Sequence, residues 1–146
     1  MSKKSINLTS FSPAFGIPSD AQLVFSVRHL SSADIKQLRR YDGRHKGIQE
    51  QLLSREEYQS TIEMIVEQVK NFLCDQKTNA ITVAVGCERG RHRSVAVIER
   101  LAEIFEDGYD IEIVHRDLER TRYEKSKQRE RNLNRDRKYG LVDDDD

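Results

Sequence analysis

A short apolar strand, a loop and an amphipathic helix follow one another over residues 81–105, and this order constrains the chain most. Residues 81–94 read Ile-Thr-Val-Ala-Val-Gly-Cys-Glu-Arg-Gly-Arg-His-Arg-Ser. The run 81–85 is typical of a strand buried in a parallel sheet, and apolar residues then recur at helical spacing. A turn from strand to helix aims backbone N–H groups and the positive end of the helix dipole at one point. We therefore expect an anion site at this loop.

The patterns before and after this unit predict further strands and helices. Residues 23–29 alternate in polarity, and residues 110–115 are rich in strand formers, so each predicts a strand. Ser54-x-x-Glu57 has the spacing of a capping box, and the apolar positions from 58 to 73 predict a long helix after it. Ser31 or Ser32 is expected to cap a short helix that ends near residue 40, and residues 41–47 are expected to form a loop with two glycines.

These elements indicate an α/β fold, a small single domain with a mostly parallel sheet, flanking helices and a basic C-terminal tail. We divide the 146 residues into a flexible N-terminus (1–9), the α/β domain (10–118), which opens with an irregular, non-helical stretch over 10–20, and a tail (119–146). The two cysteines suggest neither a disulfide framework nor a zinc site. No apolar run reaches the ~20 residues that span a bilayer, and no secretory signal is present, so we expect a cytoplasmic protein without a membrane partner.

The tail concentrates charge in a chain whose formal net charge is zero. Residues 119–138 hold nine Lys or Arg and four acidic residues, and the last four residues are all Asp. A strip of this kind can bind RNA through its phosphates with little sequence choice, and it can equally be a solubilising tail. The residues predicted for RNA contact are Arg120, Arg122, Lys125, Lys127, Arg129 and Arg131.

The predicted site lies at one edge of the sheet. In open α/β sheets, ligands collect beyond the carboxyl ends of the strands, where residue 28, the loop after residue 86 and residues 115–116 would all emerge. The residues predicted to bind the anion are Arg28, Cys87, Gly90, Arg91, His92, Arg93, Ser94, His115 and Arg116. We predict no metal and no cofactor.

The spacing Cys87-x-x-Gly-x-x-Arg93-Ser94 also resembles the phosphate loop of the cysteine-dependent phosphatases. That resemblance would make Cys87 the nucleophile, Arg93 the phosphate binder and Ser94 the hydroxyl that helps the sulfur leave. The sequence selects neither Asp42 nor Asp117 as the general acid, and Gly86 stands where many such enzymes carry His. Ordinary packing of a small thiol at a strand end remains a third interpretation.

Three motifs in the same order resemble the C-terminal domain of the RapZ (YvcJ-like) family over residues 10–120. They are the segment from Ser10-Phe11 through Gly16-Ile17-Pro18 to Val27-Arg28, the run from Gly86 to Ser94, and His115-Arg116-Asp117-Leu118. The resemblance implies a domain that binds a phosphorylated metabolite, an amino-sugar phosphate in the best-known member, and that contacts RNA and partner proteins as a sensor and adapter. It also implies that oligomers can form.

Two departures from that family stand out. Ser26 replaces an Asp, and Glu88-Arg89 replaces Thr-Gly inside the loop, so the identity of the sugar stays open. Family members carry a P-loop domain before this one, and no Gly-x-x-x-x-Gly-Lys-Ser/Thr motif occurs here, so we predict no ATPase or GTPase activity.

The leading hypothesis is therefore a non-enzymatic module that holds a sugar phosphate or nucleotide in the Cys87 loop and offers its basic tail to RNA. A cysteine-dependent phosphatase is the alternative. A purely protein-binding adapter is the third hypothesis, and it predicts that no phosphorylated metabolite stabilises the fold.

Overall fold

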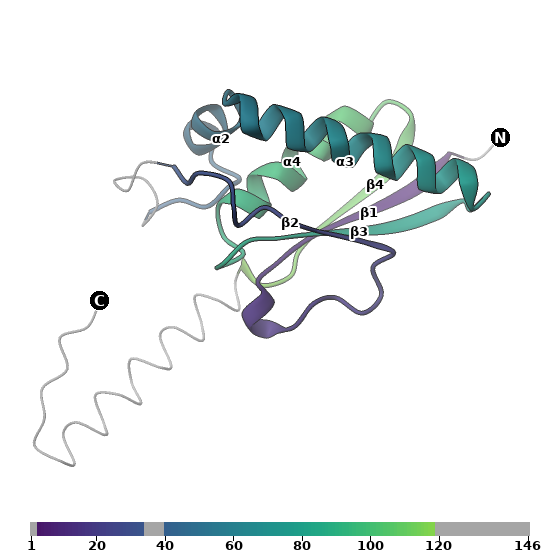
Figure 1. The fold of residues 1–146 in the computed structure, drawn as a ribbon, viewed down its shortest axis with the longest axis horizontal. Helices are drawn as coiled ribbons and strands as arrows, with labels where there is room; N and C mark the ends of the chain where they lie inside the picture. Colours follow the sequence, from purple (N-terminus) through teal and green to yellow (C-terminus); the bar gives the residue numbers. More distant parts are fainter. Residues whose placement is uncertain (1–2, 34–39, 119–146) are drawn as a thin grey trace, which may run out of the picture.

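The protein was analysed as a computed structural model, which describes residues 3–33 and 40–118 (Figure 1). Within these described residues there are four strands and three α-helices, with one 3-10 turn, η1, at Pro13–Phe15. In chain order these elements are β1 (Lys4–Phe11), β2 (Leu23–Ser26), α2 (Lys46–Leu53), α3 (Glu56–Asp75), β3 (Ala80–Gly86), α4 (Arg93–Phe105) and β4 (Tyr109–His115).

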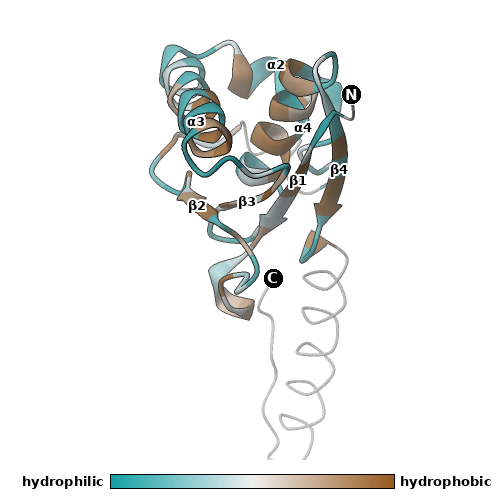
Figure 2. Ribbon diagram, turned by 90° about the vertical axis from the view of Figure 1, so that its right-hand side faces the viewer, coloured by the Kyte–Doolittle hydropathy of each residue, from teal (hydrophilic) through white to brown (hydrophobic). Residues whose placement is uncertain are grey.

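The strands form one sheet in the order β2-β3-β1-β4, and every neighbouring pair is parallel. The three helices cover one face of this sheet, whereas the connection from β1 to β2 runs along the other (Figures 1 and 2). The predicted α/β architecture with a parallel sheet is therefore confirmed.

The hydrophobic core lies between the sheet and the helical layer. Ile6 and Leu8 of β1, Val83 of β3 and Leu101 of α4 are all fully buried there. Side chains alternate along a strand, so the intervening positions point to the other face, and there they include Asn7, whose amide donates to the Thr82 hydroxyl across the sheet at 3.4 Å. Polar residues of this kind let a parallel sheet keep one face without helices.

The prediction of a flexible N-terminus over residues 1–9 is wrong for residues 4–9, which belong to the central strand β1. The start of the domain therefore moves from residue 10 to residue 4. Within residues 4–9, only Ile6 and Leu8 are apolar, and the other four residues are polar or charged. Its position between β3 and β4, which supply hydrogen bonds on both sides, comes from tertiary pairing and not from a strong local pattern.

The long helix is confirmed as α3, but its predicted capping box is wrong. Arg55 is the N-cap residue and makes no side-chain cap, while Ser54 ends α2. The Glu57 carboxylate accepts hydrogen bonds from the backbone N–H and hydroxyl of Ser31 instead. The capping box requires the Glu57 carboxylate at the start of α3, but this carboxylate is bonded to Ser31, in the segment after β2.

Smaller differences concern the connections. The predicted loop over 41–47 ends in α2, which begins at Lys46 and buries Ile48 and Leu52. The stretch over 10–20, expected to be non-helical, contains the end of β1 and the turn η1, whose first position suits a proline. The predicted strand over 110–115 is present as β4, whereas the one predicted over 23–29 is shorter, because β2 ends at Ser26.

Two further predictions concern residues that the structure does not describe. Most of the helix predicted to end near residue 40 falls on residues 34–39, and the predicted tail begins at residue 119. Within residues 3–33 and 40–118, no helix is long and apolar enough to cross a membrane.

Candidate functional site

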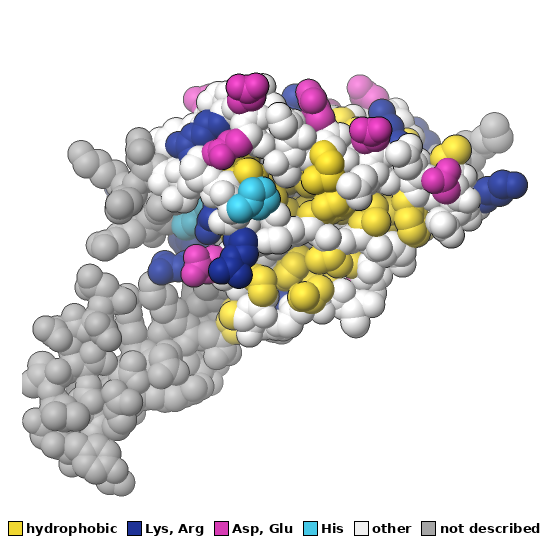
Figure 3. Space-filling view, in the orientation of Figure 1, with side chains coloured by type: hydrophobic (Ala, Val, Ile, Leu, Met, Phe, Trp, Pro, Cys, Tyr) yellow, Lys and Arg dark blue, Asp and Glu magenta, His cyan; other side chains and the backbone are white. Residues whose placement is uncertain are grey.

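The carboxyl ends of all four strands meet at one edge of the sheet. Phe11 and Ser26 each lie opposite Gly86, and Ser10 lies opposite His115, so the segments that follow these residues emerge together. Lys, Arg and His side chains gather at this end of the described part in the space-filling view (Figure 3). The predicted convergence of Arg28, the Cys87 loop and Arg116 at one edge is confirmed.

The loop between β3 and α4 is fixed to the end of β1. The Cys87 N–H donates to the Phe11 carbonyl at 3.3 Å, and the Ser12 hydroxyl donates to the Glu88 carbonyl at 2.9 Å. Gly90 has a φ of +64°, and a Cβ placed on it would lie 2.8 Å from the Phe11 carbonyl carbon and from the Ser12 nitrogen. A side chain is therefore excluded at Gly90 both by its conformation and by the backbone next to it.

Ser12 is held in turn by Asp117, which is completely buried. The Ser12 N–H donates to Asp117 Oδ2 at 2.7 Å. Arg116 donates to both oxygens of the same carboxylate, from Nε at 3.0 Å and from Nη2 at 2.8 Å, and also to the Gly16 carbonyl. Arg116 was predicted to bind the anion, but its guanidinium instead neutralises Asp117 and holds the β1–β2 connection.

His115, also predicted as an anion ligand, has both ring nitrogens engaged inside the domain. Nδ1 lies 2.8 Å from the hydroxyl of Ser10 on β1, and Nε2 lies 2.9 Å from the carboxylate of Glu99 on α4. His115 therefore links the sheet to the helix, and we assign it no ligand.

The N-terminus of α4 receives no side-chain cap from its N-cap residue, His92. The first bond of the helical pattern runs from the Ala96 N–H to the His92 carbonyl at 2.9 Å, so the N–H groups of Arg93, Ser94 and Val95 have no partner in the helical ladder. The helix dipole is positive at this end. Behind it, the buried Cys87 sulfur lies 3.2 Å from the buried Ser94 hydroxyl.

Arg93 is largely committed to the fold. Its Nη1 donates to the carbonyls of Arg28 at 2.6 Å and of Leu30 at 3.0 Å, which fixes the segment after β2 against α4. Its Nη2 lies 3.9 Å from the carboxylate of Glu88, a side chain that is 72% exposed. An anion at the loop would compete with Glu88 for this second nitrogen.

Residues 41–45 form a second wall beside the loop. The Gly43 N–H donates to the Arg91 carbonyl at 2.9 Å, and His92 Nε2 lies 2.8 Å from the Tyr41 carbonyl oxygen. A Cβ on Gly43 would lie 2.4 Å from the His92 carbonyl oxygen, so this close approach requires glycine. The sequence predicted a loop with two glycines over 41–47, but it did not identify Tyr41, Gly43 or Ser12 as site residues.

Asp42, in the same wall, carries an ionised carboxylate. Burial would raise its pKa, but hydrogen bonds from the side chain and backbone of Arg44, together with the positive charges of Arg44 and Arg91, hold the pKa below its ordinary value. Asp117 is engaged by Arg116 and Ser12 as described above. Both acids predicted for a phosphatase mechanism therefore have structural partners.

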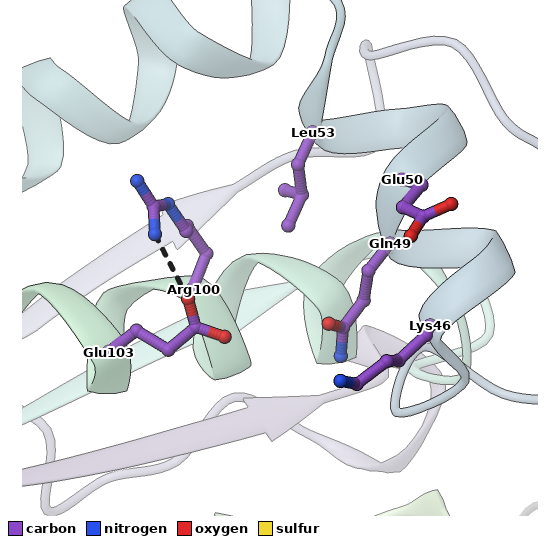
Figure 4. A pocket seen from close by; sticks show the side chains of 6 residues that line it. All are labelled: Lys46, Gln49, Glu50, Leu53, Arg100 and Glu103. Atoms are coloured by element: carbon purple, nitrogen blue, oxygen red, sulfur yellow. Dashed lines mark hydrogen bonds and ion pairs between the residues drawn. The ribbon is translucent and has the colours of Figure 1, made fainter.

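A separate hollow of about 300 Å³ lies between α2 and α4 (Figure 4). Arg100, which pairs with Glu103 at 2.9 Å, lies seven residues after the start of α4, or roughly 10 Å along a helix that rises ~1.5 Å per residue. The hollow is thus distinct from the loop. It is lined by Lys46, Gln49, Glu50, Leu53, Arg100 and Glu103.

The described ranges hold no group of three or more His, Cys, Asp or Glu side chains that could bind a metal ion. The residues predicted for RNA contact, from Arg120 to Arg131, lie outside these ranges.

Comparison with known proteins gives a consistent result. The family model of the RapZ C-terminal domain matches residues 4–119. The chain is 33% identical over 120 residues to the nucleotide-binding protein YvcJ of Bacillus subtilis, a match that covers 80% of the chain and 41% of that protein. It is 34% identical over 128 residues to a nucleotide-binding protein of Carboxydothermus hydrogenoformans, covering 84% of the chain and 44% of the relative. The chain thus spans about two fifths of the length of these relatives.

Substitution of Gly90 tests the rigidity of the loop. We expect Gly90→Ala to lower the free energy of unfolding by about 1–3 kcal/mol from its backbone conformation alone, with a further loss from the contact with Phe11 and Ser12. Gly108→Ala is the matched control, because nothing lies within 4 Å of its added Cβ, and it should change stability by less than ~0.5 kcal/mol. Equal unfolding curves in urea for the two variants would contradict this account.

The lowered pKa of Asp42 predicts a pH dependence of stability. A carboxylate with a lowered pKa in the folded state stabilises the protein above its unfolded pKa, and this contribution is lost as the pH falls through the folded pKa. The stability advantage of the native protein over Asp42→Asn should therefore be constant above about pH 5 and shrink below the ordinary value of 3.8. Chemical denaturation from pH 7 to pH 2.5 measures it. An advantage that persists unchanged to the lowest pH would refute the assignment, and exposed Asp20→Asn serves as the control.

Proposed function

Because the chain belongs to the family of the RapZ C-terminal domain, we propose that it is a non-enzymatic module that binds a phosphorylated small molecule at residues 87–94. One observation carries this proposal. The loop is anchored by Ser12 and Gly90, and it leads directly into the uncapped N-terminus of α4 at the carboxyl edge of the sheet. Such an arrangement presents backbone N–H groups to an anion at little cost in conformational entropy.

The charges around the loop support an anionic ligand. Arg89, Arg91 and Arg93 lie within five residues of one another at the positive end of the α4 dipole, and the carboxylates of Glu88 and Asp42 lie near Arg93 and Arg91. Positive side chains are unfavourable at a helix N-terminus, and they also repel each other. A phosphate would be attracted both by these side chains and by the helix dipole.

The ligand is a sugar phosphate or a nucleotide. The relatives are named nucleotide-binding proteins, and this favours the second class, although the chain matches only about two fifths of their length. The proposed contacts come from the main chain of 93–95 and from the side chains of Arg28 and Arg91.

Three observations weigh against the phosphatase alternative. Cys87 is only 2% exposed, so its sulfur is poorly placed to attack a substrate. The guanidinium of Arg93 is bonded to two backbone carbonyls. The Asp42 carboxyl has a lowered pKa, which leaves it without a proton to donate at neutral pH.

Opposite charge changes beside the loop should move phosphate affinity in opposite directions. We expect Arg91→Ala to weaken binding of inorganic phosphate and Glu88→Gln to strengthen it, each by about fivefold, because a unit charge at about 4 Å in water contributes ~1 kcal/mol. Calorimetric titration measures both, with the exposed Lys70→Ala on α3 as a control that should not change affinity. Cys87→Ser should retain binding, and loss of a phosphatase turnover in that variant would favour the enzyme. If the native protein binds no small phosphate, the proposal fails.

The basic tail is a second part of the proposal, supported by the excess of cations over residues 119–138. Each phosphate contact adds to the salt dependence of nucleic-acid binding. We expect replacement of Arg120, Arg122, Lys125 and Lys127 by Gln to weaken RNA binding and to flatten its dependence on salt, while phosphate binding at the loop stays unchanged. Fluorescence anisotropy with a short labelled RNA at several salt concentrations tests this. An unchanged salt slope would remove RNA from the function.

A further inference from the structure

We infer that Tyr41 is a stacking surface for a nucleobase whose phosphate occupies the Cys87–Ser94 loop, so that the ligand of this site is a nucleotide and not a simple sugar phosphate. The inference rests on the proposed anion site and adds to it the recognition of the base. It follows from the hydrogen bond between Tyr41 and His92, and from the stacking and exposure of the Tyr41 ring.

Tyr41 is tied directly to the residue that precedes α4. Its carbonyl oxygen lies 2.8 Å from His92 Nε2, and His92 is the N-cap of that helix. Two residues later, the Gly43 N–H donates to the Arg91 carbonyl. The backbone of 41–43 is therefore hydrogen-bonded to residues 91–92, and one imidazole side chain joins the Tyr41 carbonyl to the N-cap of α4.

The ring of Tyr41 is already positioned for stacking. It lies parallel to the His45 ring, with the centroids 3.9 Å apart and an angle of 15° between the planes. Tyr41 is nevertheless 39% exposed, although it is a large aromatic residue. His45 Nδ1 is buried and has no hydrogen-bond partner among the described residues, and His45 contacts Tyr41 with its ring face.

A base placed on the exposed side would continue this stack. Stacking on an aromatic side chain tolerates any base, because every base has a π-face. The ribose of a nucleotide separates its phosphate from its base, and here the His92 side chain connects the N-cap of α4 to the main chain of Tyr41. A sugar phosphate would fill the loop and leave the tyrosine unused, so the two ligand classes are separable by experiment.

A tryptophan reporter gives the first test, because the chain contains no Trp. We expect the fluorescence of Tyr41→Trp to be quenched on addition of AMP and to remain constant on addition of ribose 5-phosphate. Tyr109→Trp is the matched control: Tyr109 begins β4 and lies at the opposite, amino edge of the sheet, so neither compound should change its fluorescence. Equal responses of the Tyr41→Trp protein to both compounds would overturn the inference.

Affinity provides the second test. In the full native chain, AMP should bind about 5- to 150-fold more tightly than ribose 5-phosphate, which is the factor expected for stacking of one base. Tyr41→Ala should abolish this preference while it leaves the affinity for ribose 5-phosphate unchanged, and Tyr41→Phe should retain it. If ribose 5-phosphate binds the native protein as tightly as AMP, Tyr41 does not read the base. If neither compound binds, the phosphate site itself is wrong, and the inference falls with it.

Discussion

The buried carboxylate of Asp117 organises the edge of the sheet on which the candidate site depends. An isolated buried charge would be very costly, so the bidentate pair with Arg116 and the hydrogen bond from the Ser12 N–H are what make its burial tolerable. Through Ser12, this carboxylate fixes the end of β1. The hydroxyl of the same serine holds the Glu88 carbonyl, so the position of the loop derives from an acid at the end of β4.

The arginines at this edge of the sheet fall into two groups, those bonded within the fold and those exposed to solvent. Arg93 and Arg116 donate hydrogen bonds to backbone carbonyls, and Arg116 also donates to Asp117. These bonds hold the carboxyl edge of the sheet in its observed geometry. Arg28 and Arg89 are exposed at the same edge, Arg28 after β2 and Arg89 within the loop. A substitution in the first group would damage the fold and the site together. Affinity alone is therefore best measured through residues such as Arg91 and Glu88.

Local patterns predicted the elements whose signal is complete within a few residues. The strand–loop–helix unit around Cys87 and the long helix α3 are of this kind, since their apolar spacing alone defines them. The part of β1 over residues 4–9 was missed because its two apolar residues are a weak pattern, and its burial comes from strands 75 to 105 positions away. The roles of His115 and Arg116 were also beyond a local analysis. Their motif resembled a ligand set, whereas their partners, Ser10 and Gly16, lie on another segment.

Glu88 places a negative charge in the loop that is proposed to bind phosphate, and this charge would oppose the binding of phosphate. Its carbonyl is fixed by Ser12, yet its carboxylate is 72% exposed and lies 3.9 Å from Arg93. A negative charge in that position lowers the affinity for every phosphate by a similar factor, because the repulsion acts on the group they share. A ligand that gains contacts elsewhere offsets this loss, and a bare phosphate does not. Under the proposed function, Glu88 and Tyr41 would therefore act together: the acid would weaken the binding of every phosphate, and stacking on the tyrosine would offset that loss for a ligand that carries a base.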